Sequence, residues 1–105
     1  MAALAIEIDK DRLRDFCRRW KITEFALFGS VTRPDEFRAD SDVDVLVRFA
    51  PDAKSSLFDF VRAHDELAEI FGRKVDLVER EMVEESTNRF RKRSILRSVV
   101  LLDVA

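Results

Sequence analysis

Residues 27–49, LFGSVTRPDEFRADSDVDVLVRF, join an apolar segment, a glycine, a polar loop and a second apolar segment that opens with two carboxylates. Asp42 and Asp44 stand two residues apart, and side chains at that spacing on a β-strand point to the same face. The alternate positions face the other way and are apolar: Val43, Val45, Val47 and Phe49. Neighbouring carboxylates repel each other, and strands seldom contain Asp. A divalent cation would remove the repulsion, and Mg²⁺, which prefers oxygen ligands, suits the pair best.

Gly29 directly follows an apolar segment, residues 22–28, that we expect to be a buried strand. Glycine serves where the backbone turns sharply or approaches a ligand closely. The amides of such a turn, the hydroxyl of Ser30 and the guanidinium of Arg33 would together form a phosphate-binding loop. A Gly-Ser pair is weak evidence alone, but the Asp-Val-Asp sequence at the start of the next strand makes the pattern much more specific.

A third carboxylate, Asp76, interrupts a short apolar segment, residues 74–78, that predicts a further strand. An Asp at the end of a strand is most often a solvated turn residue. If this strand pairs with the strand of Asp42 and Asp44 and shows the same face, however, the three carboxylates converge. In that case a functional site is the better interpretation.

Helical spacing predicts three helices: from a cap at Asp9 to about Lys21, from a cap at Ser55 or Ser56 to Phe71, and from Asn88 or Arg89 to Leu101. The first has an apolar stripe of Leu13, Phe16, Cys17 and Trp20, in which we interpret Cys17 as a core residue. The second has a stripe of Leu57, Phe60, Val61, His64, Leu67, Ala68 and Phe71. On this stripe we interpret His64 as a packed or edge histidine, with a role in a functional site as the alternative. Gly72 predicts a cap at the end of the helix.

The last predicted helix is basic, with Arg89, Arg91, Lys92, Arg93 and Arg97. Its apolar residues would pack on the body of the protein: Ile95, Leu96, Val99 and Leu102. A solvated basic face is the usual explanation for such a helix. The alternative is a surface that meets nucleotide phosphates, RNA or an acidic partner.

The 105 residues predict one domain, 1–105, with 19 basic and 21 acidic side chains and a net charge of -2. This balance argues against nucleic-acid binding driven by overall charge. The single cysteine excludes an internal disulfide, and one His with one Cys cannot form a zinc site of the usual kind. The first residues lack the features of a signal peptide, and no segment reaches the ~20 apolar residues of a membrane span. We therefore expect a cytoplasmic protein without a membrane partner.

The chain resembles the minimal nucleotidyltransferases of the polymerase-beta superfamily in three motifs: Gly29-Ser30, Asp42-Val43-Asp44 and Val75-Asp76-Leu77. Arg33 and Ser41 also match the family pattern, and the resemblance extends from Phe25 to about Ser98. The chain departs from this pattern in two places. The loop before Asp42 holds one residue more than is usual, and the chain has no Tyr, which the family often has near its end.

The resemblance implies an α/β (α+β) fold in which a small mixed β-sheet is flanked by helices. It assigns catalysis and the binding of two Mg²⁺ ions to Asp42, Asp44 and Asp76, and nucleotide binding to Gly29, Ser30 and Arg33. Asp76 would also assist deprotonation of the attacking hydroxyl. The implied reaction is in-line attack on the α-phosphorus of ATP, with pyrophosphate as the leaving group.

Many members of this group accompany a HEPN-domain partner and act as antitoxins, some by transferring AMP from ATP to a tyrosine of that partner. The resemblance therefore implies a Mg²⁺-dependent nucleotidyltransferase that is the antitoxin of a HEPN toxin. One alternative is a binding module that neutralises such a partner without turnover. Another is transfer to a small molecule, which normally needs a further domain for the acceptor. A chain of 105 residues leaves no room for that domain, although a homodimer could supply the surface.

Overall fold

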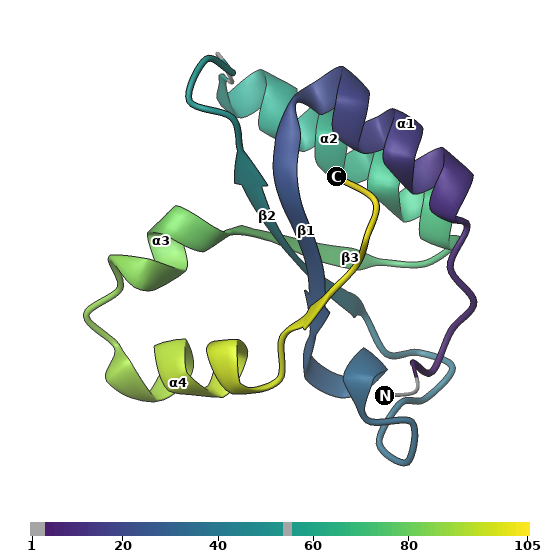
Figure 1. Cartoon of the computed structure of the whole chain (residues 1–105). Coiled ribbons are helices and arrows are strands. Elements are labelled where there is room, and N and C mark those ends of the chain that lie inside the picture. Colours follow the sequence, from purple (N-terminus) through teal and green to yellow (C-terminus); the bar gives the residue numbers. More distant parts are fainter. Residues whose placement is uncertain (1–3, 54–55) are drawn as a thin grey trace.

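The computed structural model describes residues 4–53 and 56–105, arranged around a small β-sheet (Figure 1). Along the chain the elements are α1 (Lys10–Trp20), β1 (Ile22–Phe28), the short 3₁₀ helix η1 (Gly29–Thr32), β2 (Val43–Phe49), α2 (Leu57–Phe71), β3 (Val75–Glu79), α3 (Arg80–Glu84), α4 (Arg89–Arg97) and β4 (Val100–Leu101). The strands stand in the order β3-β2-β1-β4. Strand β1 is antiparallel to β2 and to β4, whereas β2 and β3 are parallel. The predicted fold class, a mixed sheet flanked by helices, is confirmed.

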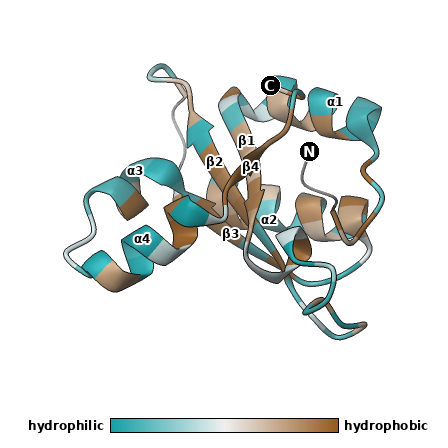
Figure 2. Ribbon diagram, turned by 60° about the horizontal axis from the view of Figure 1, so that its bottom comes forward, coloured by the Kyte–Doolittle hydropathy of each residue, from teal (hydrophilic) through white to brown (hydrophobic). Residues whose placement is uncertain are grey.

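The main core lies between the sheet and helices α1 and α2. Val43, Val45 and Val47 are fully buried there, as their period-two spacing predicts, whereas Phe49 at the strand end is only half-buried. In this core the rings of Phe16 and Phe25 meet edge to face with 6.5 Å between their centroids. In Figure 2 the strands are largely hydrophobic, while much of α1 is hydrophilic on its outer side.

Helix α1 has the predicted bounds and the predicted buried stripe. The side chain of Asp9 accepts a hydrogen bond from the Arg12 amide and so caps the first turn. Burial raises the pKa of the Cys17 thiol to about 12, in keeping with its interpretation as a core residue. The indole Nε1–H of Trp20 donates to Glu66 over 2.8 Å and ties α1 to α2.

Helix α2 begins with a capping box between Ser56 and Asp59 and ends at Gly72, whose φ of 68° is that of the predicted cap. Ser55, the other candidate cap, lies outside the described residues. The predicted stripe is partly wrong, because Leu57 is 80% exposed whereas Ala63 is buried. Ala63 and Leu67 are the buried side chains of α2, four residues apart, and Phe60 and Ala68 pack beside them against the core.

His64 is half-buried, as a packing residue on this helix should be. Its Nε2–H donates to the carbonyl oxygen of Val75 over 2.8 Å, which fastens α2 to the start of β3. The side chain therefore satisfies a backbone acceptor at the edge of the sheet.

The last quarter of the chain corrects the prediction of one long helix from Asn88 or Arg89 to Leu101. Helix α4 ends at Arg97, and the following residues form β4, where Leu27 pairs with Val100. Ser98 ends the helix because its hydroxyl binds carbonyl oxygens of the preceding turn, and the β-branched residues after it favour a strand. The short helix α3 was not predicted.

A second, smaller core lies on the opposite face of the sheet, under α3 and α4, and consists of Ala26, Phe28, Leu46, Val83 and Ile95. Leu46 shares the face of Asp44 and is buried, so on this face of β2 the carboxylates are confined to the start of the strand. Asp44 near the start of the strand and Arg48 near its end are half-buried. No helix among the described residues is both long enough and apolar enough to cross a membrane.

Candidate active site

Strands β2 and β3 bring the three predicted carboxylates to one end of the sheet. In their parallel register Asp44 is the partner of Asp76, and Asp42 lies directly before β2, near enough for its charge to act on Asp44. Asp42 and Asp76 are exposed, whereas Asp44 is half-buried. We call these three side chains the acidic group.

The charges of the acidic group act on one another. Desolvation, and then the charges of Asp76 and Asp42, raise the pKa of the Asp44 carboxyl to about 6, while the guanidinium of Arg33 opposes the rise. Both desolvation and like charges disfavour the ionised form of a carboxyl group. The ionised acidic group is therefore unfavourable by itself, and a bound cation would stabilise it.

Gly29 lies directly against Asp44. The glycine has a φ of +73°, and a Cβ atom at this position would stand 2.1 Å from Oδ2 of Asp44. Both the backbone conformation and the space therefore require a residue without a side chain. The amide of Gly29 donates to the hydroxyl oxygen of Ser98 over 3.2 Å, which joins the turn to the end of α4.

Ser30 and Arg33 follow on η1 and its cap. Ser30 is half-buried, and its carbonyl oxygen accepts a hydrogen bond from the Arg33 amide over 2.9 Å. The Arg33 side chain is exposed, pairs with Glu36 and lies near enough to Asp44 to lower its pKa. The structure thus gathers all six predicted site residues around the end of β1 and the starts of β2 and β3.

The loop between Arg33 and Asp42, which holds the additional residue, is folded back against the start of β3. The guanidinium of Arg73 stacks over the ring of Phe37 at 4.6 Å and donates to the carbonyl oxygen of Ser41 over 3.2 Å. The hydroxyl oxygen of Ser41 accepts a hydrogen bond from the Arg38 amide over 2.9 Å. Asp44, which follows this loop, is in register with Asp76 of β3.

The residues of the acidic group fit a metal bound together with a nucleotide better than an isolated ion. In the part of the chain that the structure describes, no three His, Cys, Asp or Glu side chains are already arranged to hold a metal. Mg²⁺, however, is usually held by one or two carboxylates and completes its coordination with water and substrate phosphates. Asp42 and Asp44 supply such hard oxygen ligands, and burial together with the neighbouring carboxylates raises the pKa of Asp44, whose ionised form a bound cation would stabilise.

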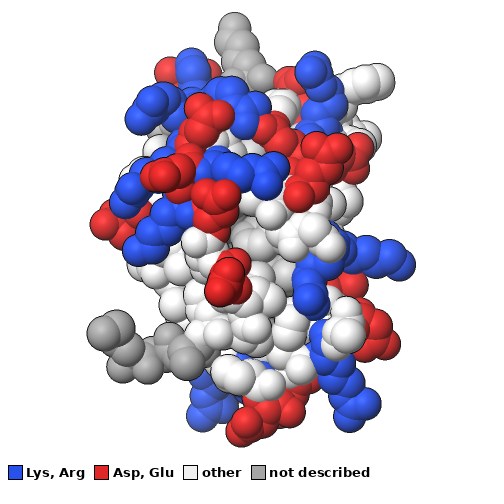
Figure 3. All heavy atoms as spheres, turned by 90° about the vertical axis from the view of Figure 1, so that its right-hand side faces the viewer, with Lys and Arg blue, Asp and Glu red and all other residues white. Residues whose placement is uncertain are grey.

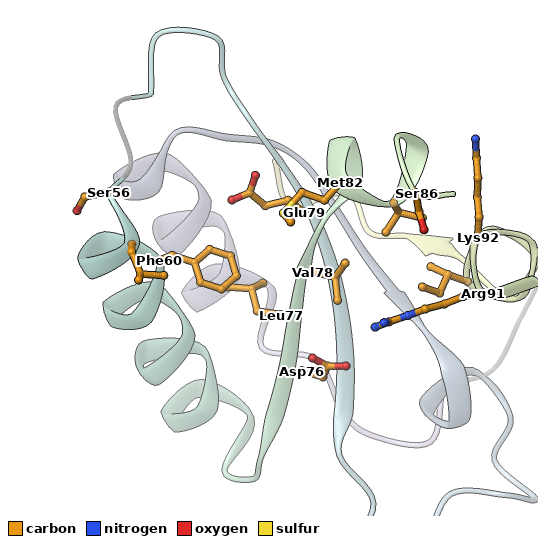
Figure 4. Close-up of a pocket in the computed structure, with 13 residues that line it drawn as sticks. Ser56, Phe60, Asp76, Leu77, Val78, Glu79, Met82, Ser86, Arg91 and Lys92 are labelled. Atoms are coloured by element: carbon orange, nitrogen blue, oxygen red, sulfur yellow. The ribbon is translucent and has the colours of Figure 1, made fainter. Parts of the chain in front are cut away.

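Beside Asp76 the surface forms a hollow of about 560 Å³ along the edge strand β3 (Figure 4). Figure 4 shows Phe60 and Leu77 on the side of α2 and Met82 on the side of α3, with Arg91 of α4 directed toward β3. We call this the apolar hollow. Two of its apolar side chains are largely exposed, Leu57 by 80% and Met82 by 67%.

Sequence analysis missed the residues that α4 contributes to this region. Ser98 contacts Gly29, and Arg91 lines the apolar hollow beside Asp76, although both are distant from these partners in the chain. No local spacing signals such contacts, because they depend on how α4 crosses the sheet. The only sequence signal was the excess of basic residues in this segment.

The chain is similar in sequence and in structure to known nucleotidyltransferases. The profile of a family described as a nucleotidyltransferase domain matches residues 10–102. A Methanocaldococcus jannaschii protein named as a putative protein adenylyltransferase is 31% identical over 77 residues, which are 73% of this chain and 73% of that protein. A solved structure described as a putative minimal nucleotidyltransferase is 30% identical, with a TM-score of 0.66, and the match covers 89% of this chain and 88% of the other.

Two solved toxin–antitoxin complexes share the fold at lower sequence identity. One, crystallised with AMP-PNP, has a TM-score of 0.65 and 19% identity over 90% of this chain and 72% of the other. The second contains a tri-AMPylated Shewanella oneidensis HEPN toxin and an MNT antitoxin. It has a TM-score of 0.57 and 18% identity over 88% of this chain and 66% of the other.

Proposed function

Because this chain belongs to the nucleotidyltransferase domain family and is a nucleotidyltransferase, we propose that it transfers AMP from ATP to a hydroxyl group of a HEPN-domain toxin and thereby acts as the antitoxin. The observation that carries the proposal is the register of Asp44 with Asp76 beside the Gly29 turn. The adenylyltransferase named above and the AMPylated HEPN toxin in a structure of the same fold support the choice of reaction and partner.

In this proposal Asp42 and Asp44 hold magnesium together with the triphosphate of ATP. When bound there, Mg²⁺ neutralises negative charge on the phosphate oxygens around the reacting phosphorus. Ser30 and Arg33 bind the β- and γ-phosphates. Gly29 allows the close approach of Asp44 to the turn, while its amide is already bound to Ser98.

Asp76 is the proposed base. It accepts the proton of the acceptor hydroxyl as that oxygen forms a bond to the α-phosphorus. The bond between the α-phosphorus and the bridging oxygen breaks, and pyrophosphate leaves with the electron pair. The apolar hollow supports entry of the acceptor from the side of β3, because Asp76 is one of its lining residues (Figure 4).

The test uses the purified chain, its HEPN partner, magnesium and ATP labelled in the AMP moiety. We expect label on the partner, and we expect Asp44→Asn to reduce the rate at least about a hundredfold. ATP binding without label on the partner would contradict protein adenylylation. If Asp44→Asn lost labelling but still neutralised the toxin, the antitoxin effect would come from binding and not from catalysis.

A further inference from the structure

A second hollow, of about 720 Å³, lies between η1 and α4. Its lining residues are Thr32, Arg33, Phe90, Arg93, Ser94, Arg97, Ser98, Val99 and Val100. Three are arginines, three carry hydroxyl groups, and none of these nine described residues is acidic. We call this the basic hollow.

One face of α4 forms the wall of the basic hollow. Phe90, Arg93, Ser94 and Arg97 follow one another at intervals of three, one and three residues, the spacing of side chains on one helical face. Arg91 and Ile95 lie on another face and line the apolar hollow. Helix α4 therefore separates a basic compartment from an apolar one.

The cations of this wall have no acidic partner within the described parts of the chain, since no ion pair there involves Arg93 or Arg97. Some of the other basic side chains are paired, for example Arg19 with Asp15 at 3.0 Å. Figure 3 shows this intermixing of basic and acidic side chains on another face of the molecule. Arg93 and Arg97 are thus available to an anionic ligand.

The basic hollow adjoins the acidic group on the side opposite to the apolar hollow. The strands stand in the order β3-β2-β1-β4, and the apolar hollow borders β3 at one edge of the sheet. The basic hollow lies toward the other edge, because it is lined by Val100 of β4 and by Thr32 in the turn after β1. Two contacts connect it to the reacting region. The hydroxyl of Ser98 accepts a hydrogen bond from the Gly29 amide, and the Arg33 amide donates to the carbonyl oxygen of Ser30 in the same turn.

This placement matches the geometry of in-line displacement, in which the attacking oxygen and the leaving group lie on opposite sides of the phosphorus. If the acceptor enters beside Asp76, pyrophosphate leaves toward the basic hollow. Pyrophosphate is multiply charged, and the guanidinium fork of Arg binds phosphate oxygens with paired, charge-assisted hydrogen bonds.

We propose that Arg93 and Arg97 bind the β,γ-pyrophosphate portion of the nucleoside triphosphate and hold it in line with the acceptor. This inference rests on the proposed function and adds a binding site on α4 to the motifs of the strands. Because the ligand is defined by its charge and geometry, inorganic pyrophosphate with magnesium is a sufficient probe of the site.

The experiment is isothermal titration of the full chain with magnesium pyrophosphate, magnesium ATP and AMP. We expect Arg93→Ala and Arg97→Ala each to weaken pyrophosphate and ATP binding about tenfold, and the double variant about a hundredfold. AMP binding should change less than about twofold, and Arg97→Lys should restore part of the affinity. The matched control is Arg62→Ala, which removes the same charge from an exposed position on α2.

Several results would overturn the inference. Wild-type affinity for pyrophosphate in the double variant would exclude the site, and an equal loss in Arg62→Ala would show that only overall charge matters. If the double variant lost the HEPN partner but kept pyrophosphate, α4 would be a partner surface instead. If the double variant kept both ATP affinity and labelling of the partner, only this inference would fail. Failure of the wild type to bind ATP would overturn the proposed function as well.

Discussion

At the scale of single residues, the contact between Gly29 and Asp44 is the most constrained feature of the site. We predict that Gly29→Ala destabilises the protein by about 2–3 kcal/mol, because the added methyl group meets the carboxylate and the backbone conformation is strained. ATP affinity should fall at least about tenfold, since the carboxylate must move. Urea denaturation and calorimetry would measure the two effects.

Gly72 provides the control for this substitution. Its φ of +68° is almost the same, but a Cβ atom there would meet nothing within 4 Å. Gly72→Ala should therefore cost only the backbone strain, about 1 kcal/mol, and leave ATP affinity unchanged. Equal effects of the two substitutions on ATP affinity would show that the contact with Asp44 is unimportant.

The ionisation of Asp44 gives a second prediction at this scale. The pKa of its carboxyl is about 6 in the folded protein and 3.8 as the unperturbed value, so the folded state binds the proton more tightly. The charge therefore reduces stability increasingly as pH rises from about 4 to about 6. We expect Asp44→Asn to be more stable than the wild type at pH 8 and nearly equal to it at pH 4.

Urea denaturation without magnesium at pH 4, 6 and 8 would measure this difference in the free energy of unfolding. Asp52→Asn is a suitable control, because Asp52 is exposed and pairs only with Lys21 in the described structure. An advantage of Asp44→Asn that stayed constant over this pH range would contradict the assignment.

At the scale of elements, the position of α4 decides the shape of both hollows. Ile95 is the buried anchor of this helix, and Ile95→Ala should cost about 2–4 kcal/mol in stability. It should also weaken ATP binding, because the wall of the basic hollow would no longer be fixed. Phe90→Ala on the same helix should change stability by less than about 0.5 kcal/mol, since that ring is 88% exposed.

The sequence predicted those elements whose signals are local. Asp9 and Gly72 mark helix ends by capping, and the alternation around Val45 marks β2 as a strand. The extent of α4 and the existence of β4 were not predictable in this way. Leu101 joins the sheet only because β1 offers a free edge, and that partner lies about 75 residues earlier in the chain, at Ala26.

At the scale of the whole molecule, the acidic group lies between two hollows of different character. We predict that Leu57→Glu and Met82→Glu reduce labelling of the HEPN partner at least about tenfold without changing ATP affinity, because both side chains line the apolar hollow and are exposed. Leu101→Glu, an equally exposed change on β4, is the control. Loss of ATP affinity in the first two variants would instead place the nucleotide in the apolar hollow.

The sequence could indicate the acidic group but not the hollows beside it. Asp42, Asp44 and Asp76 were identified because carboxylates are unusual in strands, and their convergence required only that β2 and β3 pair. The hollows arise from the way α2, α3 and α4 are placed around one sheet. Their lining residues carry ordinary patterns of surface helices, so only the three-dimensional arrangement distinguishes them.

Gly29 lies so close to Asp44 that a methyl carbon on the glycine would stand 2.1 Å from the carboxylate. This contact also affects how the sequence of such a protein can change once its activity is lost. While the aspartate is kept for chemistry, selection must also keep the glycine. Once the aspartate is replaced by a smaller residue, the steric reason for the glycine disappears. Among inactive descendants we therefore expect Asp44 to be replaced before Gly29. The order of these two replacements would show that catalysis was lost before the conformation of the turn.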